Sequence, residues 1–176
     1  MEIKKISLGF LLIFVLLSCK KDKHNPDVVI IGHAGTGLYG VYPANTLESF
    51  RNAFALGVDG VEMDVQMTKD SILVIFHDYT LDDLTNGTGC VWDYTWEELK
   101  KIEYDTYPFG RYKIRQVSDL LRLPESNMKI IIWDIKSYSN DEKYLNILNQ
   151  KVAHLITYYN VQVSRPEKSL HIYQIY

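Results

Sequence analysis

Four short apolar segments, each carrying a histidine or a carboxylate at or near its end, limit what this chain can fold into. They occupy residues 28–31, 58–66, 72–76 and 129–135. Short apolar runs bounded by turn residues indicate buried strands. Because helix-forming segments separate most of these strands, the pattern predicts an α/β fold in which helices cover a parallel sheet.

The helices between these strands are predicted from capping residues and helical spacing. Asn45 can cap a helix with Glu48 three residues on, and the apolar residues that follow recur at helical spacing until Gly57. Apolar residues between 145 and 159 predict a longer amphipathic helix. The tail at 161–176 could hold a fifth strand.

One connection is too short for a simple parallel sheet. Only a turn at residues 68–71 separates the second and third strands, whereas a parallel crossover takes about a dozen residues or more. A hairpin centred on Lys69 and Asp70 is the alternative, and it would place Glu62 opposite His77 as cross-strand neighbours. Either arrangement is expected to bring this carboxylate and this imidazole together.

Polar groups at the carboxyl ends of parallel strands meet at one edge of the sheet, where barrel active sites are assembled. The residues delivered there are His33, Glu62, Asp64, His77, Asp134 and Lys136. Three carboxylates held close together repel one another unless a cation joins them, so the set favours a hard divalent ion. Taken singly, each histidine also fits an ordinary structural position, and the carboxylates of the second strand fit the solvated face of an antiparallel sheet.

The charge balance excludes one class of partner. The 176 residues include 19 Lys plus Arg and 22 Asp plus Glu, which gives a net charge of −3. Without a basic surface the chain cannot neutralise a phosphate backbone, so no nucleic-acid partner is expected. Cys19 and Cys90 are the only cysteines, which is too few for a disulfide framework or a cysteine-based metal site.

The N-terminal segment is typical of an export signal. A basic lead at residues 1–5 precedes an apolar run at 6–17, which is shorter than the span of about 20 residues that crosses a bilayer and fits a secretory signal. Leu16-Leu17-Ser18-Cys19 resembles a bacterial lipobox, which implies cleavage before Cys19 and lipidation of that cysteine. A plain cleaved signal is the alternative.

These features divide the chain into three parts. We expect a lipoprotein signal peptide at residues 1–18, a polar tether at 19–26 and a folded domain at 27–176. The expected location is exported and lipid-anchored to a bacterial membrane, on its periplasmic or cell-surface side.

Six short motifs in a fixed order resemble one enzyme family. They are IIGHAG at 30–35, PANTLESF at 43–50, GVDGVEMDVQMTKD at 57–70, LVIFHD at 73–78, TNGTG at 85–89 and WDIK at 133–136. Together they resemble the N-terminal half of the glycerophosphodiester phosphodiesterase family, within the phospholipase-C-like phosphodiesterase superfamily. Several linked motifs in order are more specific than any one of them.

The resemblance implies a metal-dependent hydrolase with a TIM-type β/α barrel. Its substrate would be a small-molecule glycerophosphodiester, cleaved to glycerol phosphate and an alcohol. The roles implied are an acid–base pair at His33 and His77, metal ligands at Glu62, Asp64 and Asp134, substrate contacts at Lys136 and Gly35, and Mg²⁺ or Ca²⁺ as the ion.

Three residues depart from the family pattern. Ala34 replaces a usual Arg, so the phosphate loses a bidentate donor. Ala44 replaces a Glu that usually ligates the metal, and Asp134 stands where Glu is usual. Three carboxylates with water can still hold the ion, with weaker binding expected.

Length is the other departure. Cleavage before Cys19 would leave residues 19–176, whereas a complete barrel takes about 250 residues. We therefore expect a partial barrel of roughly the first four or five strands, with open sheet edges that allow self-association. The alternatives are a fragment of a longer product, pairing with a second copy, and a non-catalytic remnant of the family, or pseudoenzyme.

Overall fold

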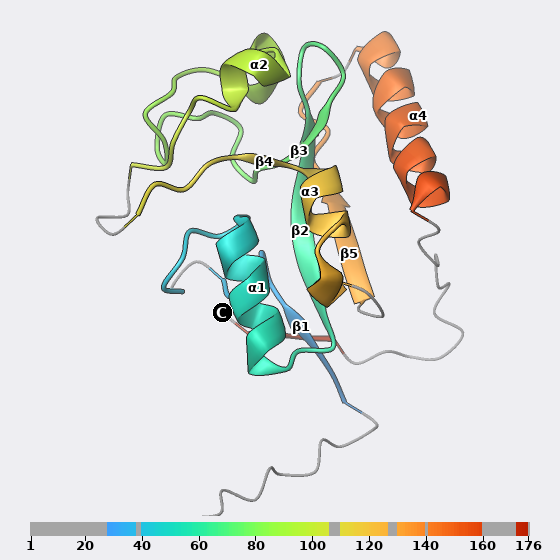
Figure 1. Cartoon of the computed structure of the whole chain (residues 1–176). Helices are drawn as coiled ribbons and strands as arrows, with labels where there is room; N and C mark the ends of the chain where they lie inside the picture. The colour runs from blue at the N-terminus through green and yellow to red at the C-terminus, as the bar shows by residue number, and fades with distance from the viewer. Residues whose placement is uncertain are drawn as a thin grey trace, which may run out of the picture.

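The computed structural model describes residues 28–37, 40–105, 110–126, 130–139 and 141–159, together with the backbone of a strand at 172–175. The predicted signal peptide, the lipidation of Cys19 and the tether at 19–26 lie outside the described residues. The elements in chain order are β1 (Val29–Gly32), α1 (Leu47–Leu56), β2 (Gly60–Met67), β3 (Leu73–Ile75), η1 (Val91–Asp93), α2 (Trp96–Leu99), β4 (Arg115–Gln116), α3 (Val117–Leu121), η2 (Pro124–Ser126), β5 (Ile130–Ile135), α4 (Glu142–Tyr158) and β6 (Ile172–Ile175) (Figure 1).

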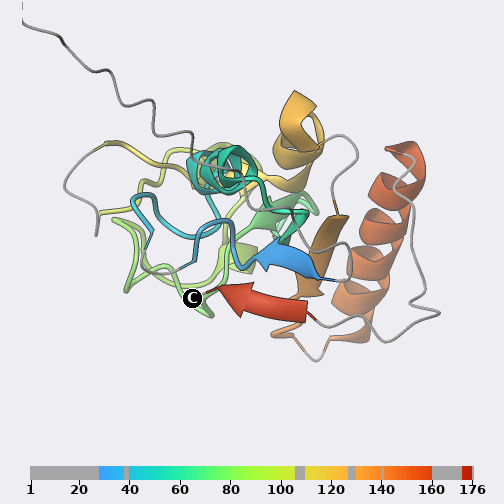
Figure 2. The ribbon, with the colours of Figure 1, turned by 90° about the horizontal axis from the view of Figure 1, so that it is seen from below.

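The sheet is parallel where the sequence predicts a parallel sheet. β6, β1, β2 and β5 lie side by side in that order, and each adjacent pair is parallel. The view from below shows β6 next to β1 (Figure 2). β6 falls within the tail that was predicted to hold a fifth strand, and β2 at the centre carries the longest ladder, with β5.

The connection between β2 and β3 is the predicted hairpin, but it is centred on Asp70 and not between Lys69 and Asp70, which shifts the pairing by one residue. Val65 pairs with Ile75 in an antiparallel ladder, and Thr68 N donates to Ile72 O at 2.9 Å around a three-residue loop. Ser71 in that loop has φ 63°, the left-handed conformation that three-residue hairpin loops require. The prediction that Glu62 lies opposite His77 is therefore wrong by one position, since this register aligns residue 62 with residue 78.

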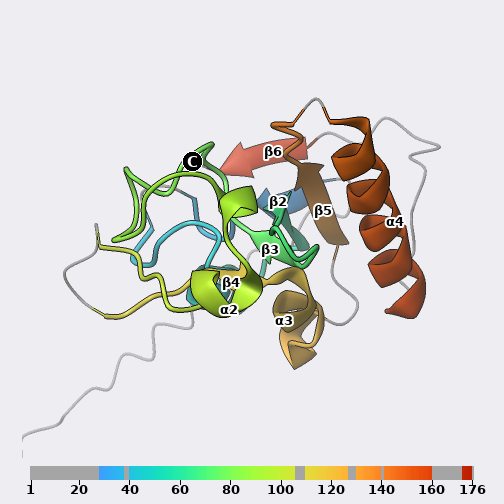
Figure 3. The ribbon, with the colours of Figure 1, turned by 90° about the horizontal axis from the view of Figure 1, so that it is seen from above.

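The larger of two apolar clusters among the described residues joins the sheet to α1, α3 and α4. On β2, Val61, Met63 and Val65 face this core, where they pack with Phe50 of α1 and Leu120 of α3. The alternate residues of β2 are also buried, as expected for a strand covered on both faces. In the view from above, the segment that holds η1 and α2 lies on one side of the sheet and α4 lies on the other, next to β5 (Figure 3). Among the described residues, no helix combines the length and apolar character needed to cross a bilayer.

Helix α1 begins one residue later than the sequence predicts. Thr46 is its N-cap, and the Thr46 hydroxyl accepts from Ser49 N at 3.2 Å. Gly57, with φ 88°, ends the helix as predicted. The prediction that Asn45 caps this helix is wrong, because the Asn45 side chain turns to β2 instead.

Candidate functional site

The three predicted metal ligands come together across two neighbouring strands. Glu62 and Asp64 alternate along β2 and therefore point to the same face, and Asp64 is paired with Asp134 of β5 in the ladder. One carboxylate oxygen from each of the three lies within 4.8 Å of the others. Glu62 and Asp64 are buried and Asp134 is exposed, so the acidic cluster opens to solvent on the β5 side.

Glu62 is held by the loop that follows β1. Ala34 N donates to Glu62 Oε2 at 3.0 Å, and His33 Nε2 lies 3.7 Å from the same oxygen. Burial, with repulsion from Asp64 as the next cause, raises the pKa of Glu62 from 4.5 to about 7. When a carboxyl group with a raised pKa ionises, a nearby cation stabilises its charge. Ala34 stands where the family that the sequence resembles usually has Arg. Its backbone amide donates to Glu62 in the acidic cluster.

Asp64 is held in place by Asn45, the residue that the sequence predicts as a helix cap. Asn45 Nδ2 donates to Asp64 Oδ2 at 2.7 Å, and Asp64 N donates to Asn45 Oδ1 at 3.1 Å. Both residues are 2% exposed, so the pair is removed from water. Asn45 has φ 64°, a conformation that asparagine adopts more readily than most residues. That tolerance was the one available sequence signal, and the capping pattern concealed it.

Lys136 neutralises part of the acidic cluster. Its Nζ lies 3.0 Å from Asp64 Oδ1 and 2.7 Å from Asp134 Oδ2. Burial opposes the charge of the ammonium group, but hydrogen bonds to Asp134 and Asp64 raise the pKa of Lys136 above its ordinary value. The residue predicted to contact a phosphate thus contacts carboxylates here, and its contact with substrate stays a prediction.

His77 lies at the end of β3, on a segment attached to the acidic cluster through the backbone. Phe76 N donates to Asp64 O at 3.0 Å. The His77 side chain is 52% exposed, and its Nδ1 lies 2.6 Å from Asp78 Oδ1. With Nδ1 engaged by this carboxylate, Nε2 is the ring nitrogen left to exchange a proton with a ligand.

Gly35 has a packing reason to be glycine. Its φ is +91°, and a Cβ at this position would lie 2.4 Å from Ser49 Oγ of α1. The loop after β1 therefore packs directly against α1, which fixes the positions of His33 and Ala34. A contact between Gly35 and substrate stays a prediction.

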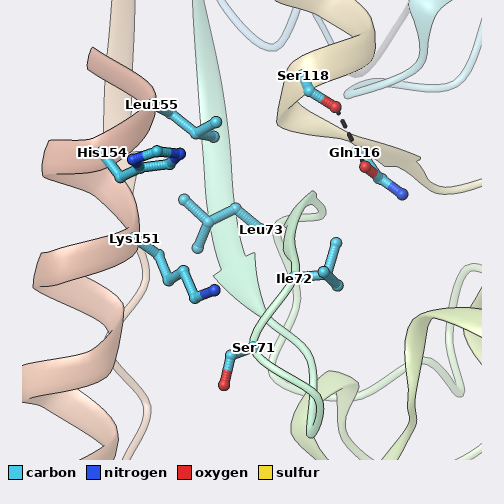
Figure 4. A pocket seen from close by; sticks show the side chains of 8 residues that line it. All are labelled: Ser71, Ile72, Leu73, Gln116, Ser118, Lys151, His154 and Leu155. Carbon is cyan, nitrogen blue, oxygen red and sulfur yellow. Dashed lines mark hydrogen bonds between the residues drawn. The ribbon is translucent and has the colours of Figure 1, made fainter. Parts of the chain in front are cut away.

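A hollow of about 150 Å³ lies between α4 and the β3–β4 side of the sheet (Figure 4). The residues that line it are Ser71, Ile72, Leu73, Gln116, Ser118, Lys151, His154 and Leu155. None of the predicted site residues is among them. The hollow is therefore separate from the predicted site residues.

The donor set suits a hard divalent cation. Carboxylate oxygens are the ligands that Mg²⁺ and Ca²⁺ prefer in proteins. Burial first, and repulsion from Asp64 second, raises the pKa of Glu62, so a bound cation would stabilise the ionised form of this carboxyl group. The residues that would hold an ion are Glu62, Asp64 and Asp134.

Comparison with known proteins gives one consistent family. The model of the glycerophosphoryl diester phosphodiesterase family matches residues 36–171. A glycerophosphodiester phosphodiesterase of Caldanaerobacter subterraneus subsp. tengcongensis is 48% identical over 75 residues, which is 43% of this chain and 30% of the relative. One of Bacillus altitudinis is 50% identical over 68 residues, which is 39% of this chain and 28% of the relative.

A solved structure extends the similarity over most of the chain. The glycerophosphoryl diester phosphodiesterase of Parabacteroides distasonis is 30% identical, with a TM-score of 0.60, and the match covers 86% of this chain and 48% of that protein. This chain therefore matches about half of the solved structure and about a third of the curated relatives. Such neighbours are TIM barrels, and the partial sheet, which is parallel from β6 through β1 and β2 to β5 and antiparallel at β3 and β4, confirms the predicted partial barrel.

Proposed function

Because the chain belongs to the glycerophosphoryl diester phosphodiesterase family, we propose that it hydrolyses small glycerophosphodiesters to glycerol phosphate and an alcohol, with the help of a divalent metal ion. One observation carries the proposal beyond the family. The three carboxylates that the motifs deliver lie within 4.8 Å of one another, and His33 lies beside one of them.

The carboxylates and Lys136 divide the electrostatic work. Glu62, Asp64 and Asp134 would hold Mg²⁺ or Ca²⁺, which when bound polarises a phosphoryl oxygen and favours the ionised form of an attacking group. Asn45 and the amide of Ala34 hold two of these carboxylates in place. Lys136 keeps a positive charge at the same cluster, where it can offset charge on the phosphate.

The two histidines would move the protons. One withdraws a proton from the attacking hydroxyl as its oxygen bonds to phosphorus, and the other donates a proton to the leaving alcohol oxygen as its bond to phosphorus breaks; an imidazole can perform either task. His77 can use Nε2 for this purpose because Asp78 engages Nδ1. His33 Nε2 lies 3.7 Å from Glu62 Oε2, which places this imidazole beside the acidic cluster.

The direct test is an assay of the full chain. Purified protein is incubated with glycerophosphoethanolamine, and released glycerol phosphate is measured with and without Mg²⁺ or Ca²⁺, and after chelation. Turnover that needs the ion supports the proposal. Folded protein that binds the ion but releases no glycerol phosphate from this or any other glycerophosphodiester would contradict it.

Ion binding is expected to depend on pH through Glu62. Its pKa in the folded chain is about 7, above the ordinary 4.5, so without the ion the free energy of unfolding should fall as the pH rises through 7. The fall should be up to about 3 kcal/mol. The ion competes with the proton, so the rise in Tm that it causes should be small near about pH 5 and large near about pH 8.

Thermal unfolding with and without Mg²⁺ checks this prediction. The matched control is Glu62→Gln, which keeps the shape of the side chain and cannot ionise. In this variant the ion-induced rise in Tm should be smaller than in the wild-type chain near about pH 8, and it should differ less between about pH 5 and about pH 8. An ion response that is the same at both pH values in the wild-type chain would contradict the prediction.

A non-catalytic member of the family is the second candidate, and one observation favours it. The Lys136 ammonium already bridges Asp64 and Asp134, so the acidic cluster has an internal partner that needs no metal. Ala44, at the position of a usual ligand, points the same way. This candidate predicts no ion-dependent change in Tm, whereas an ion response together with turnover excludes it.

A further inference from the structure

The segment that carries His77 lies beyond the last ladder pair of the hairpin. β3 pairs with β2 up to Ile75, and the described chain at residues 76–77 belongs to no strand. The His77 side chain is half exposed, so core packing does not fix its direction. That direction depends instead on the contact between His77 Nδ1 and Asp78 Oδ1 and on the peptide groups on either side of the residue.

Gln66 of β2 binds this segment at two points. Its Nε2 donates to Phe76 O at 2.9 Å and to Asp78 O at 2.8 Å. The acceptors fix the orientation of the amide, because the opposite orientation would direct its oxygen at two carbonyl oxygens. Gln66 is 1% exposed, and its Oε1 has no hydrogen-bond partner among the described residues. A buried oxygen without a hydrogen-bond partner is unfavourable. The two hydrogen bonds that Gln66 donates on either side of His77 explain why an amide side chain is nevertheless found at this position.

The carbonyl between these two is bound from another element. Tyr138, just after β5, donates its hydroxyl to His77 O at 2.7 Å. The Tyr138 ring contacts Tyr79 with centroids 5.2 Å apart, and Tyr79 contacts Trp92 at the same separation. Rings in edge-to-face contact at this distance leave no space for a ligand between them. The three rings therefore serve to hold the Tyr138 hydroxyl against the His77 segment.

We propose that Gln66 and Tyr138 are positioning residues for His77. Together they bind three successive carbonyls, at residues 76, 77 and 78, and so fix the peptide planes that direct the imidazole. The inference rests on the proposed role of His77 in hydrolysis. Because both side chains act through the backbone, their loss should alter proton transfer by His77, while binding of the ion and of substrate should be retained.

Tyr138→Phe is the main test, because it removes the hydroxyl and keeps the ring contacts. In the full chain with its ion, kcat for a glycerophosphodiester should fall about 10- to 100-fold, with KM and the ion-induced rise in Tm unchanged. Gln66→Met, which removes both donors at similar volume, should act in the same direction. The matched control is Tyr94→Phe, since Tyr94 donates its hydroxyl to Thr88 O at 2.6 Å in a loop without predicted site residues. It should leave kcat unchanged.

A second readout does not depend on turnover. The ring signals of His77 are recorded by NMR in the full chain without substrate and are assigned with His77→Gln. Tyr138→Phe should shift or broaden them, and Tyr94→Phe should not. If the wild-type chain hydrolyses no glycerophosphodiester, the proposed function fails while this readout still tests the positioning. The inference is overturned if the His77 signals are the same in Tyr138→Phe and wild type. It is also overturned if an active Tyr138→Phe variant changes only in KM, or keeps kcat within about twofold of the wild-type value.

Discussion

Replacing either His33 or His77 by alanine should lower kcat for glycerophosphodiester hydrolysis by about 10²- to 10⁴-fold, the contribution expected of a general acid or base. The folded state should be little affected by the change at His77, which is half exposed. His33 lies against Glu62, so its loss should also change the packing around that buried carboxyl group. The pH profile should lose one limb in each variant, and the limb that disappears assigns the acid and the base.

The control for these variants is His154→Ala. His154 is exposed on α4 and lines the hollow of Figure 4, so its removal should leave kcat, KM and the pH profile unchanged. Steady-state kinetics over a range of pH makes the comparison. If His77→Ala retains wild-type kcat at every pH, this residue has no acid–base role and the two-histidine scheme fails.

Asn45→Ala should produce the largest loss of stability of any polar substitution considered for this chain. It removes a hydrogen bond to a buried carboxylate, leaves the amide of Asp64 without its partner and places alanine at φ 64°. The lost hydrogen bond to a buried charged group and the unpaired buried amide together suggest a loss of about 3–5 kcal/mol. Denaturation in urea measures it, and the ion-induced rise in Tm should also shrink because Asp64 is no longer held.

Asn86→Ala is the matched control for Asn45. Its side chain accepts from Glu103 N at 3.0 Å, in an exposed contact, so the same chemical change should cost only about 1 kcal/mol. Equal losses of stability at the two positions would show that the bond between Asn45 and Asp64 contributes no more than an ordinary surface contact. That result would remove the reason for assigning Asn45 to the site.

The elements that sequence reasoning predicted are those encoded by local patterns. The two-residue alternation in β2 set Glu62 and Asp64 on one face, and the same alternation placed Asp134 on β5, so the acidic cluster required only that the two strands be parallel neighbours. The end of α1 at Gly57 was likewise local, because a left-handed glycine is a direct signal.

The features that sequence reasoning missed depend on a single backbone angle or on contacts between distant segments. The hairpin register follows from the left-handed conformation of Ser71, which serine does not announce. Asn45 had two plausible partners, and only the fold decides between the helix and Asp64. The bonds from Gln66 and Tyr138 to the His77 segment join residues whose proximity no local pattern contains.

Strand β2 is both the central structural strand and part of the candidate site. All eight of its residues are buried, it pairs with β1, β3 and β5, and it carries two of the three carboxylates of the acidic cluster. In a library of random variants, substitutions in β2 should therefore lower cellular abundance and activity together. A change that damages the site there also destabilises the chain and exposes it to degradation. At His77, which is half exposed, substitutions should lower activity without lowering abundance. Activity can therefore be lost in evolution more easily at this position than at β2, because the folded protein is kept.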